Sequence, residues 1–329
     1  MSFSIYIDSD EVAFVANEGE TILESAKNNN VNLRDGCVKG ICRVCKMILV
    51  SGDIKYPQGS TICLTSDEIV ENYILPCCAL PQSDLVCSQD NSMSGKKYIK
   101  EGVLVISKED KGSVCILRLK LSASSSFSAR PGDYIEVEFG VNKYRKYSVA
   151  NNPRRDGYVE LHIRYREGGA FSKHLRNSIV LNDVLWIRGP YGETTFNLAS
   201  KRALLLIATG TGLAPILSML RSEHIDSNRE ILLYWGCRYS EDLYYMDTIL
   251  SVIDKFARLE FVPILSRPAE GNWEGVVGYV QNCVLDEVNS LHSFDVYACG
   301  SPEMIQDAFN IFTKHLSLPA SQFYSDAFY

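Results

Sequence analysis

The chain has 329 residues, 46% of them hydrophobic, a formal net charge of -7 and an isoelectric point near 5.4. This length is typical of two or three domains, and the composition gives each of them an apolar core. The acidic balance argues against a nucleic-acid-binding protein, and the chain has no Lys/Arg cluster of the kind that binds an anionic membrane surface. Residues 1–10 lack a positively charged start followed by an apolar run, so we expect a cytoplasmic protein whose 11 cysteines stay reduced.

The N-terminal part of the chain predicts a compact, β-rich unit. Two short strands are expected at 3–7 and 12–15, followed by a helix at 21–28. A cysteine-rich loop comes next, and a further strand is expected at 46–50. The polar, glycine-containing stretch 91–97 has the composition of a linker and indicates the end of this unit.

Four cysteines in this unit have a spacing with chemical meaning. Cys37, Cys42 and Cys45 follow the pattern C-x4-C-x2-C, and Cys77 comes later in the chain. That layout is typical of a plant-type [2Fe–2S] cluster, in which one tight loop supplies three thiolates and a distant segment supplies the fourth. Tetrahedral zinc is the alternative, but structural zinc sites usually take their ligands as two close pairs. Cys78 is the alternative fourth ligand; we favour Cys77, because Cys78 then points the other way in an extended stretch.

The middle of the chain predicts an antiparallel barrel. Short apolar runs are separated there by Gly, Pro and Asn at intervals that suit such a fold. The expected strands lie at 103–106, 114–121, 134–139, 159–164 and 184–187, with one helix near 172–177.

The last part of the chain predicts a parallel sheet flanked by helices, because apolar strands alternate with helical patterns. The expected strands are 203–208, 230–235, 259–264 and 296–298, and the expected helices are 215–223, 244–256 and 302–316. The uncharged stretch 203–220 meets the crude length test for a membrane span. Gly210, Gly212 and Pro215 in its middle favour a buried strand, a tight turn and a new helix instead.

A short motif in the barrel is suited to a flavin. Arg145, Tyr147 and Ser148 form the string R-x-Y-S in an expected strand. A guanidinium can bind a pyrophosphate with two hydrogen bonds, a phenol ring can lie on an aromatic cofactor, and the serine hydroxyl is placed at the ring edge. The alternative is a solvated strand with one packed tyrosine.

A second motif follows 20 residues later, where Gly168, Gly169 and Ser172 precede or begin a helix. Glycines let a phosphate approach the backbone, and the free amides of a helix start, together with a hydroxyl, neutralise its charge. The competing interpretation of Ser172 is a plain N-cap serine.

A third motif, Gly210, Thr211, Gly212 and Pro215, follows an expected strand and opens a helix. It lacks the last glycine of the Rossmann fingerprint, because Pro215 stands there instead. Proline in the first helical turn costs no hydrogen bond, and the two glycines leave room for the pyrophosphate of a dinucleotide.

The loop after the next strand bears on the choice of coenzyme. Arg238 attracts a 2′-phosphate, whereas Glu241 and Asp242 repel one and can accept ribose hydroxyls. We therefore favour NADH and leave NADPH open. A further strand ends at Cys299, Gly300, Ser301 and Pro302, which places a thiol at the same edge of the sheet; the alternative is a small buried residue at a strand end.

Together these motifs resemble the ferredoxin–NADP reductase superfamily, with a plant-type ferredoxin module at the N-terminus. The resemblance implies that the R-x-Y-S residues hold FAD, with Ser148 near the flavin N5, and that Cys299 lies beside the nicotinamide C4. It also implies that Gly300 and Pro302 belong to the coenzyme site. The aromatic segment 323–329 resembles the family's terminal segment, which implies that Phe328 shields the flavin face.

The same resemblance implies a multidomain fold. The expected domains are an α+β, β-grasp [2Fe–2S] ferredoxin domain at 1–92, an antiparallel β-barrel FAD domain at 98–198 and an α/β parallel-sheet NAD(P)-binding domain at 199–329.

Two subgroups share this domain order: reductases of bacterial oxygenases, and CDP-6-deoxyglucoseen reductases of dideoxysugar synthesis. The strings 74–78, 234–236, 297–301 and 323–328 are closer to the sugar enzymes, although 241–244 is also similar to oxygenase reductases. The resemblance implies an enzyme that passes electrons from NADH through FAD and the cluster to a partner protein. That partner is a pyridoxamine-phosphate (PMP)-dependent sugar dehydrase or an oxygenase component.

One residue departs from both subgroups, because Arg43 stands where they usually have glycine or serine. A long cation beside the cluster raises its potential or alters partner docking. The alternative from another class is a non-catalytic redox-sensing or zinc-stabilised interaction protein that keeps the fold without turnover.

Overall fold

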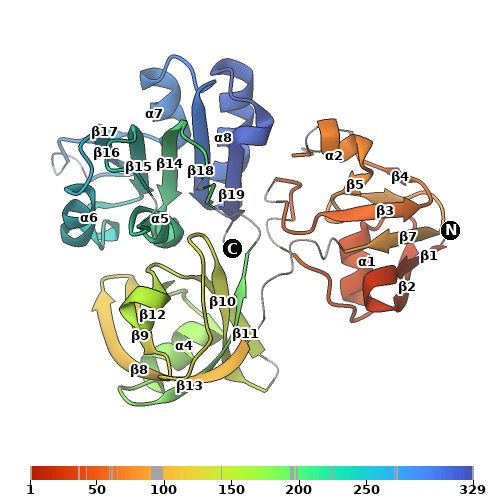
Figure 1. Ribbon diagram of the computed structural model, residues 1–329, viewed down its shortest axis with the longest axis horizontal. Coiled ribbons are helices and arrows are strands. Elements are labelled where there is room, and N and C mark those ends of the chain that lie inside the picture. The colour runs from red at the N-terminus through yellow and green to blue at the C-terminus, as the bar shows by residue number, and fades with distance from the viewer. Residues whose placement is uncertain are drawn as a thin grey trace.

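The computed structural model describes residues 2–327 except 36, 37, 42, 59, 61, 65, 90–98, 142, 193–195, 198, 224, 270 and 272. It consists of three units (Figure 1). An N-terminal unit in red and orange lies beside a barrel in yellow and green and a C-terminal unit in green and blue. The expected multidomain fold is confirmed, while the linker expected at 91–97 lies outside the described residues.

The N-terminal unit is a five-stranded mixed sheet in the order β2-β1-β7-β3-β5, with helix α1 packed against its core. Thr21 is the N-cap of helix α1: its side chain accepts a hydrogen bond from the Glu24 amide, and the Glu24 side chain accepts one from the Thr21 amide. The elements are β1 Ser2–Ile7, β2 Val12–Asn17, α1 Ile22–Asn28, β3 Met47–Ser51, β4 Ile54–Lys55, α2 Ser66–Val70, β5 Tyr73–Ile74, β6 Leu80–Pro81 and β7 Leu85–Ser88.

The second unit is an antiparallel barrel with the strand order β11-β10-β13-β8-β9-β12. The two end strands of this order are joined by a bridge between Val149 and Leu161, which closes the barrel. The elements are β8 Ile99–Lys111, β9 Val114–Lys120, β10 Tyr134–Gly140, β11 Lys143–Ser148, α3 Pro153–Asp156, β12 Tyr158–Arg164, α4 Ala170–Asn177 and β13 Val184–Tyr191.

The C-terminal unit is a parallel sheet in the order β17-β16-β15-β14-β18-β19, with helices on both faces (Figure 1). The elements are β14 Ala203–Thr209, α5 Leu213–Leu220, β15 Ile231–Cys237, α6 Met246–Ile253, β16 Leu259–Leu265, β17 Val276–Val277, α7 Val280–Glu287, β18 Phe294–Gly300, α8 Pro302–His315 and β19 Phe323–Ala327. The uncharged stretch 203–220 forms β14, a 3-10 turn at Gly210–Gly212 and α5, as expected. Within the described part of the chain, no helix has both the length and the apolar character needed to cross a membrane.

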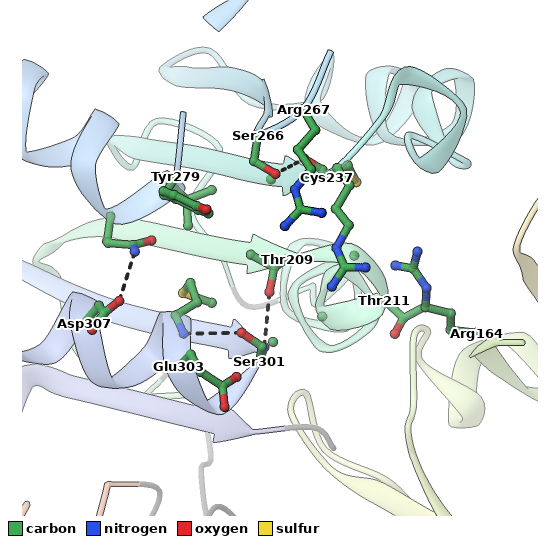
Figure 2. Close-up of a pocket in the computed structure, with 18 of the residues that line it drawn as sticks. Arg164, Thr209, Thr211, Cys237, Ser266, Arg267, Tyr279, Ser301, Glu303 and Asp307 are labelled. Carbon is green, nitrogen blue, oxygen red and sulfur yellow. Dashed lines mark hydrogen bonds between the residues drawn. The ribbon is translucent and has the colours of Figure 1, made fainter. Parts of the chain in front are cut away.

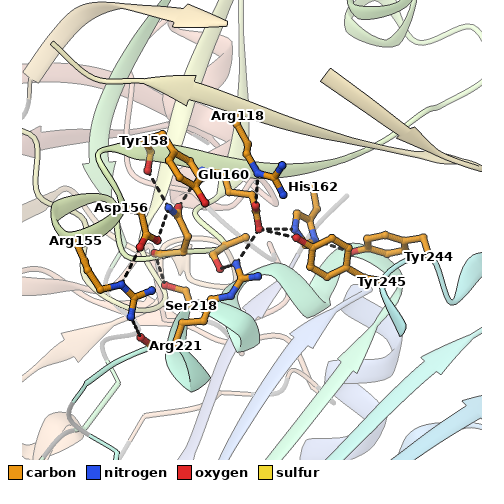
Figure 3. Close-up of polar contacts among 12 residues, drawn as sticks. Arg118, Arg155, Asp156, Tyr158, Glu160, His162, Ser218, Arg221, Tyr244 and Tyr245 are labelled. Atoms are coloured by element: carbon orange, nitrogen blue, oxygen red, sulfur yellow. Dashed lines mark hydrogen bonds and ion pairs between the residues drawn. The ribbon is translucent and has the colours of Figure 1, made fainter. Parts of the chain in front are cut away.

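A buried polar network joins the barrel to the C-terminal unit (Figure 3). Its centre is Glu160 of β12, which is 1% exposed. Its carboxylate accepts hydrogen bonds from Arg118 Nε at 2.7 Å, from Arg221 Nη1 at the end of α5 at 2.8 Å and from Tyr245 Oη at 3.0 Å. Because one cation comes from the barrel and the other from the C-terminal unit, this carboxylate ties the two units together.

His162 extends this network toward the cavity between the two units. Its Nε2 lies 3.3 Å from the Glu160 carboxylate and its Nδ1 lies 2.8 Å from Tyr244 Oη. Complete burial lowers the pKa of His162, so the imidazole stays neutral. Burial opposes the charge on Glu160, but the His162 hydrogen bond and the Arg221 charge outweigh it and hold the pKa of Glu160 far below its usual value.

Replacing Glu160 with glutamine is expected to destabilise the fold by about 3–5 kcal/mol, because Arg118 and Arg221 lose their shared counter-charge. Urea unfolding followed by tryptophan fluorescence measures the change. Glu230→Gln is the control, because the Glu230–Arg258 pair is exposed, and it is expected to change stability by less than about 0.5 kcal/mol. Equal effects of the two substitutions would contradict the role of the network.

Acid is expected to weaken the same network. The unfolded chain protonates His162 below its ordinary pKa of 6.5, whereas the folded protein resists protonation. The free energy of unfolding is therefore largest above that pH and falls by about 1 kcal/mol between pH 7.5 and 5.5. It falls further below pH 4.5, because the unfolded chain takes up a proton on Glu160 that the folded protein refuses. Urea midpoints measured across this range should fall less steeply for His162→Gln; an identical slope would refute the assignment.

Candidate functional site

A cavity of about 250 Å³ lies between the barrel and the C-terminal unit. It is lined by β11, by β12, by the start of α4 and by the turn before α5. The structure brings together there the predicted flavin-site residues Arg145, Tyr147, Ser148, Gly169 and Ser172, with Thr211 of the third motif.

The start of α4 is suited to a pyrophosphate. Gly168 has φ +68°, a conformation that favours glycine, and a Cβ there would meet open space. The N-cap is Gly169, whose lack of a side chain leaves the first helix amides without a capping acceptor, and residues 169–172 line the cavity. Ser172 lies inside the helix and accepts a hydrogen bond from the Arg166 amide at 2.8 Å, which makes the plain N-cap interpretation of Ser172 wrong.

The charge of this cavity also fits a pyrophosphate. Arg145, Lys146, Arg164 and Arg166 all line it. Tyr147 packs against Phe171 with ring centroids 5.4 Å apart, which gives the cavity an aromatic wall. Cations, open helix amides and an aromatic wall together are the chemistry that an isoalloxazine ring and its pyrophosphate need.

Ser148, which lines this cavity, contacts a residue of β19 that sequence reasoning missed. The Ser148 hydroxyl donates a hydrogen bond to Asp326 Oδ2 at 3.4 Å. Asp326 lies on β19, directly opposite Cys299 of β18 in the parallel register. Burial raises the pKa of Cys299, so this residue is a neutral thiol. In the sequence, Asp326 stands out only as the single acidic residue of the terminal aromatic segment. The predicted flavin-shielding residue of that segment, Phe328, lies outside the described residues.

A larger cavity of about 770 Å³ lies at the carboxyl ends of β14, β15, β16 and β18 (Figure 2). The predicted residues Gly210, Thr211, Gly212, Arg238 and Gly300 line it. Pro215, Asp242, Cys299 and Pro302 are buried and are not among its lining residues. Arg164, Arg166 and Thr211 line both cavities, so the two spaces adjoin.

The glycine turn is held in place by close backbone contacts. A Cβ on Gly212 would lie 2.1 Å from the carbonyl oxygen of Cys299, so only glycine fits between the turn and β18. The Trp235 indole donates a hydrogen bond to the Gly210 carbonyl at 2.9 Å. These contacts fix the turn at the sheet edge where parallel α/β proteins bind nucleotides.

The cysteine loop of the N-terminal unit curls as a cluster-binding loop must. Cys45 and Cys77 are 5% and 6% exposed, while Cys37 and Cys42 lie outside the described residues. Val38, Gly40 and Arg43 have φ values of +52°, +75° and +62°, so the loop reverses direction repeatedly.

The surroundings of Cys45 and Cys77 also fit a [2Fe–2S] cluster. Burial raises the pKa of Tyr56 to about 12, and Cys78, Cys45 and Cys77 beside it add to the shift. Three thiols therefore lie near the half-buried phenol of Tyr56, as a compact cluster site requires. Cys78 is half-buried, and its sulfur lies 3.7 Å from that of Cys77. The expectation that Cys78 points the other way in an extended stretch is wrong, because residues 76–78 form a turn in which the Cys78 amide donates a hydrogen bond to the Leu75 carbonyl.

This loop is docked against both other units, near the end of β19 (Figure 1). Ile41 and Val44 belong to the apolar core of the C-terminal unit. Lys39 Nζ lies 3.1 Å from Glu303 at the start of α8. Asp35 and Lys146 of β11 form a second ion pair at 2.7 Å. The predicted cluster loop thus lies beside the strand that carries Asp326.

Comparison with known proteins assigns each unit to a family. Residues 5–82 match the 2Fe-2S iron-sulfur cluster binding domain, 103–196 the oxidoreductase FAD-binding domain and 206–309 the oxidoreductase NAD-binding domain. These matches confirm the cofactors predicted from the sequence: a [2Fe–2S] cluster, FAD and a nicotinamide coenzyme.

Whole proteins with the same three units are also similar to the chain. The CDP-6-deoxy-L-threo-D-glycero-4-hexulose-3-dehydrase reductase of Yersinia pestis is 31% identical over 335 residues, covering 100% of this chain and 99% of that protein. The propane 2-monooxygenase reductase component of Mycolicibacterium goodii is 30% identical, covering 99% and 97%. The Amycolatopsis cytochrome P450 reductase GcoB has the same fold, with a TM-score of 0.70 at 23% identity over 99% of this chain and 98% of that one.

The fold and its two adjoining cavities define an NAD(P)H-dependent electron-transfer oxidoreductase. The chain belongs to the family of iron–sulfur flavoprotein reductases, whose members include reductase components that supply electrons to a partner protein.

Proposed function

We propose that this protein supplies electrons to a PMP-dependent CDP-4-keto-6-deoxyglucose 3-dehydrase in dideoxysugar biosynthesis. The observation that carries the proposal is the end-to-end similarity to the Yersinia dehydrase reductase, with 31% identity over 100% of this chain. The sequence strings of the chain that are closer to sugar reductases than to oxygenase reductases support the same partner.

The roles of the two redox cofactors follow from their general chemistry. When bound, FAD would supply an acceptor for the hydride of the coenzyme, and a [2Fe–2S] cluster would supply a one-electron carrier toward the partner. The proposed ligands of the cluster are Cys37, Cys42, Cys45 and Cys77.

The chain's own residues hold and orient these groups. Arg145 and the start of α4 bind the FAD pyrophosphate, and the Tyr147 ring packs on the flavin. Ser148 donates its proton to Asp326 and would place its hydroxyl oxygen beside a flavin bound in the smaller cavity. The turn at Gly210–Gly212 and the residues Gly300 and Ser301, which line the larger cavity, would orient the coenzyme, while the buried Cys299 lies behind the turn with its carbonyl against Gly212.

An oxygenase component is the second candidate partner. The propane 2-monooxygenase reductase component is 30% identical to the chain over nearly its whole length, and a phenol hydroxylase P5 protein of Acinetobacter pittii is 32% identical. Both candidates keep the same cofactors and the same internal electron path, and they differ only in the docking partner.

Reconstitution separates the two candidates. The purified holoprotein is mixed with the reduced coenzyme and one candidate partner: the sugar dehydrase with its CDP-sugar substrate under anaerobic conditions, or an oxygenase with its hydrocarbon substrate in air-saturated buffer, which supplies the O2 that it consumes. We expect deoxygenated sugar product with the dehydrase and no coupled turnover with the oxygenase. The reverse pattern would replace the proposal with the oxygenase assignment.

A further inference from the structure

Two cationic residues flank a predicted cluster ligand on one turn of the cysteine loop. The Lys46 amide donates a hydrogen bond to the Arg43 carbonyl at 2.9 Å, and the turn that this bond closes contains Cys45. Arg43 also follows directly after Cys42 in the chain. Both cationic side chains therefore start within two residues of a proposed ligand of the cluster.

One carboxylate of α2 binds both cations. Glu68 Oε1 accepts a hydrogen bond from Arg43 Nη2 and another from Lys46 Nζ, the second at 2.8 Å. The side chains of Arg43, Lys46 and Glu68 are 24%, 14% and 12% exposed. Lys46 Nζ also lies 4.4 Å from the centre of the Tyr73 ring, which holds the ammonium in place. Two cations and one carboxylate leave one net positive charge beside the loop.

The backbone of Arg43 has a conformation that favours glycine. Its φ is +62°, in the left-handed region, which costs a residue with a Cβ about 1 kcal/mol. Such a conformation persists where surrounding contacts hold it, and it is concentrated at functional sites. The contact that holds Arg43 is the partly buried pair with Glu68. The fold therefore keeps a cation at a position where glycine would be less strained.

The guanidinium of Arg43 is turned toward the protein itself. It is bound to Glu68, and most of the side chain is covered. Burial raises the pKa of the Tyr324 phenol on β19, and the nearby Arg43 charge opposes that rise, so the guanidinium lies near the C-terminal unit. Two roles were expected for Arg43 from the sequence, and this placement favours an effect on the cluster potential over a contact with the partner.

A fixed positive charge beside the cluster changes the free energy of its reduction. The cluster site is anionic because thiolates ligate the iron, and an electron that enters it adds one more negative charge. A cation in a partly buried position is screened less than one in water, so it stabilises the reduced form more than the oxidised form. One electron leaves the flavin and enters the cluster, and no bond at the cluster forms or breaks.

We propose that Arg43 raises the reduction potential of the cluster and that Glu68 is the positioning residue that keeps the guanidinium at the cluster loop. This inference rests on the cluster site of the proposed function, but it does not depend on which protein is the partner. A higher cluster potential favours electron transfer from the flavin to the cluster, which is the direction that the proposed function needs.

Anaerobic redox titration of the holoprotein, with the cluster followed by electron paramagnetic resonance, tests the inference without turnover. Arg43→Gln should lower the ratio of reduced to oxidised cluster at a fixed potential at least about 5-fold, which is about 40 mV for a one-electron couple. Arg43→Lys keeps the charge and should stay within about twofold of the unmodified protein.

Lys314→Gln is the control for the loss of one positive charge. Lys314 is exposed in the last turn of α8, whereas the cluster loop contacts the first turn of that helix through Glu303. The two residues are about 16 Å apart along the helix axis, beyond the screening length at physiological salt. This substitution should leave the potential unchanged.

A double-mutant cycle tests the role of Glu68. In the Glu68→Gln background the guanidinium loses its counter-charge and turns to solvent, so Arg43→Gln should change the ratio by less than about twofold. An effect of Arg43→Gln that is equally large in both backgrounds would overturn the positioning role of Glu68.

An Arg43→Gln protein with full iron content and an unchanged potential would overturn the inference. If that protein loses its iron, Arg43→Gly takes its place, because glycine adopts the left-handed backbone without strain, and the same fall in potential is expected. The partner reconstitution tests the proposed function separately. A lowered potential in a protein that reduces no dehydrase contradicts the proposed function alone, and an unchanged potential in a protein that reduces it contradicts this inference alone.

Discussion

Serine in place of Cys45 or Cys77 is expected to remove the iron–sulfur cluster and to cut cytochrome c reduction at least about 100-fold. Both thiols are buried in the core of the N-terminal unit, where a hydroxyl is a poor ligand for iron. Ferricyanide takes electrons directly from the flavin, so its reduction should stay within about twofold of that of the unmodified protein.

The measurements are iron and sulfide content, the visible spectrum, and the two acceptor assays on the same preparations. Cys78→Ser is the matched control, because Cys78 is the neighbour of Cys77 and only half-buried. It should keep iron content and both activities. If Cys78→Ser loses its iron and Cys77→Ser keeps it, then Cys78 and not Cys77 is the fourth ligand of the cluster.

Alanine in place of Gly212 is expected to slow flavin reduction by the coenzyme by about 10-fold or more. The added Cβ would lie 2.1 Å from the Cys299 carbonyl oxygen and 2.6 Å from its carbon, so the turn or β18 must move. That movement displaces both the pyrophosphate cradle and the Cys299 thiol. Overpacking at such a site also destabilises the fold by about 1–3 kcal/mol.

Stopped-flow absorbance of the flavin measures the rate, and urea unfolding measures the stability. Gly140→Ala serves as the control, because its Cβ would meet nothing closer than the Lys143 side chain at 3.5 Å. Unchanged flavin reduction in Gly212→Ala would show that the close contact with β18 does not position the coenzyme.

Local signals in the sequence predicted the elements that carry the site. Apolar periodicity located β14 and α5, and the glycines between them located the turn, because a tight turn beside β18 admits no Cβ at Gly212. The R-x-Y-S and G-x-x-S strings located residues that the fold brings to one cavity, although they lie on different elements. The observed strand and helix boundaries differ from the predicted ones by a few residues where hydrogen bonding to a neighbouring strand extends an element.

Features that depend on tertiary contacts were missed. Strand β19 forms by pairing with β18, and its buried Ser325 interrupts the apolar alternation that would have marked it. Helix α7 buries the polar Gln281 beside Val280, which blurs its apolar stripe. The role expected for Asp242 depended on its facing the ribose, but Arg164 of the barrel holds the carboxylate, an interaction that local sequence does not encode.

The most direct test of the electron path is anaerobic stopped-flow mixing of the holoprotein with one equivalent of reduced coenzyme. Flavin absorbance and cluster absorbance are followed in the same traces. The account predicts that the flavin band bleaches first and the cluster band follows, because the coenzyme cavity adjoins the flavin cavity, and the Asp35–Lys146 ion pair joins the segment before the cluster loop to a strand that lines the flavin cavity. Bleaching of the cluster before the flavin would contradict it.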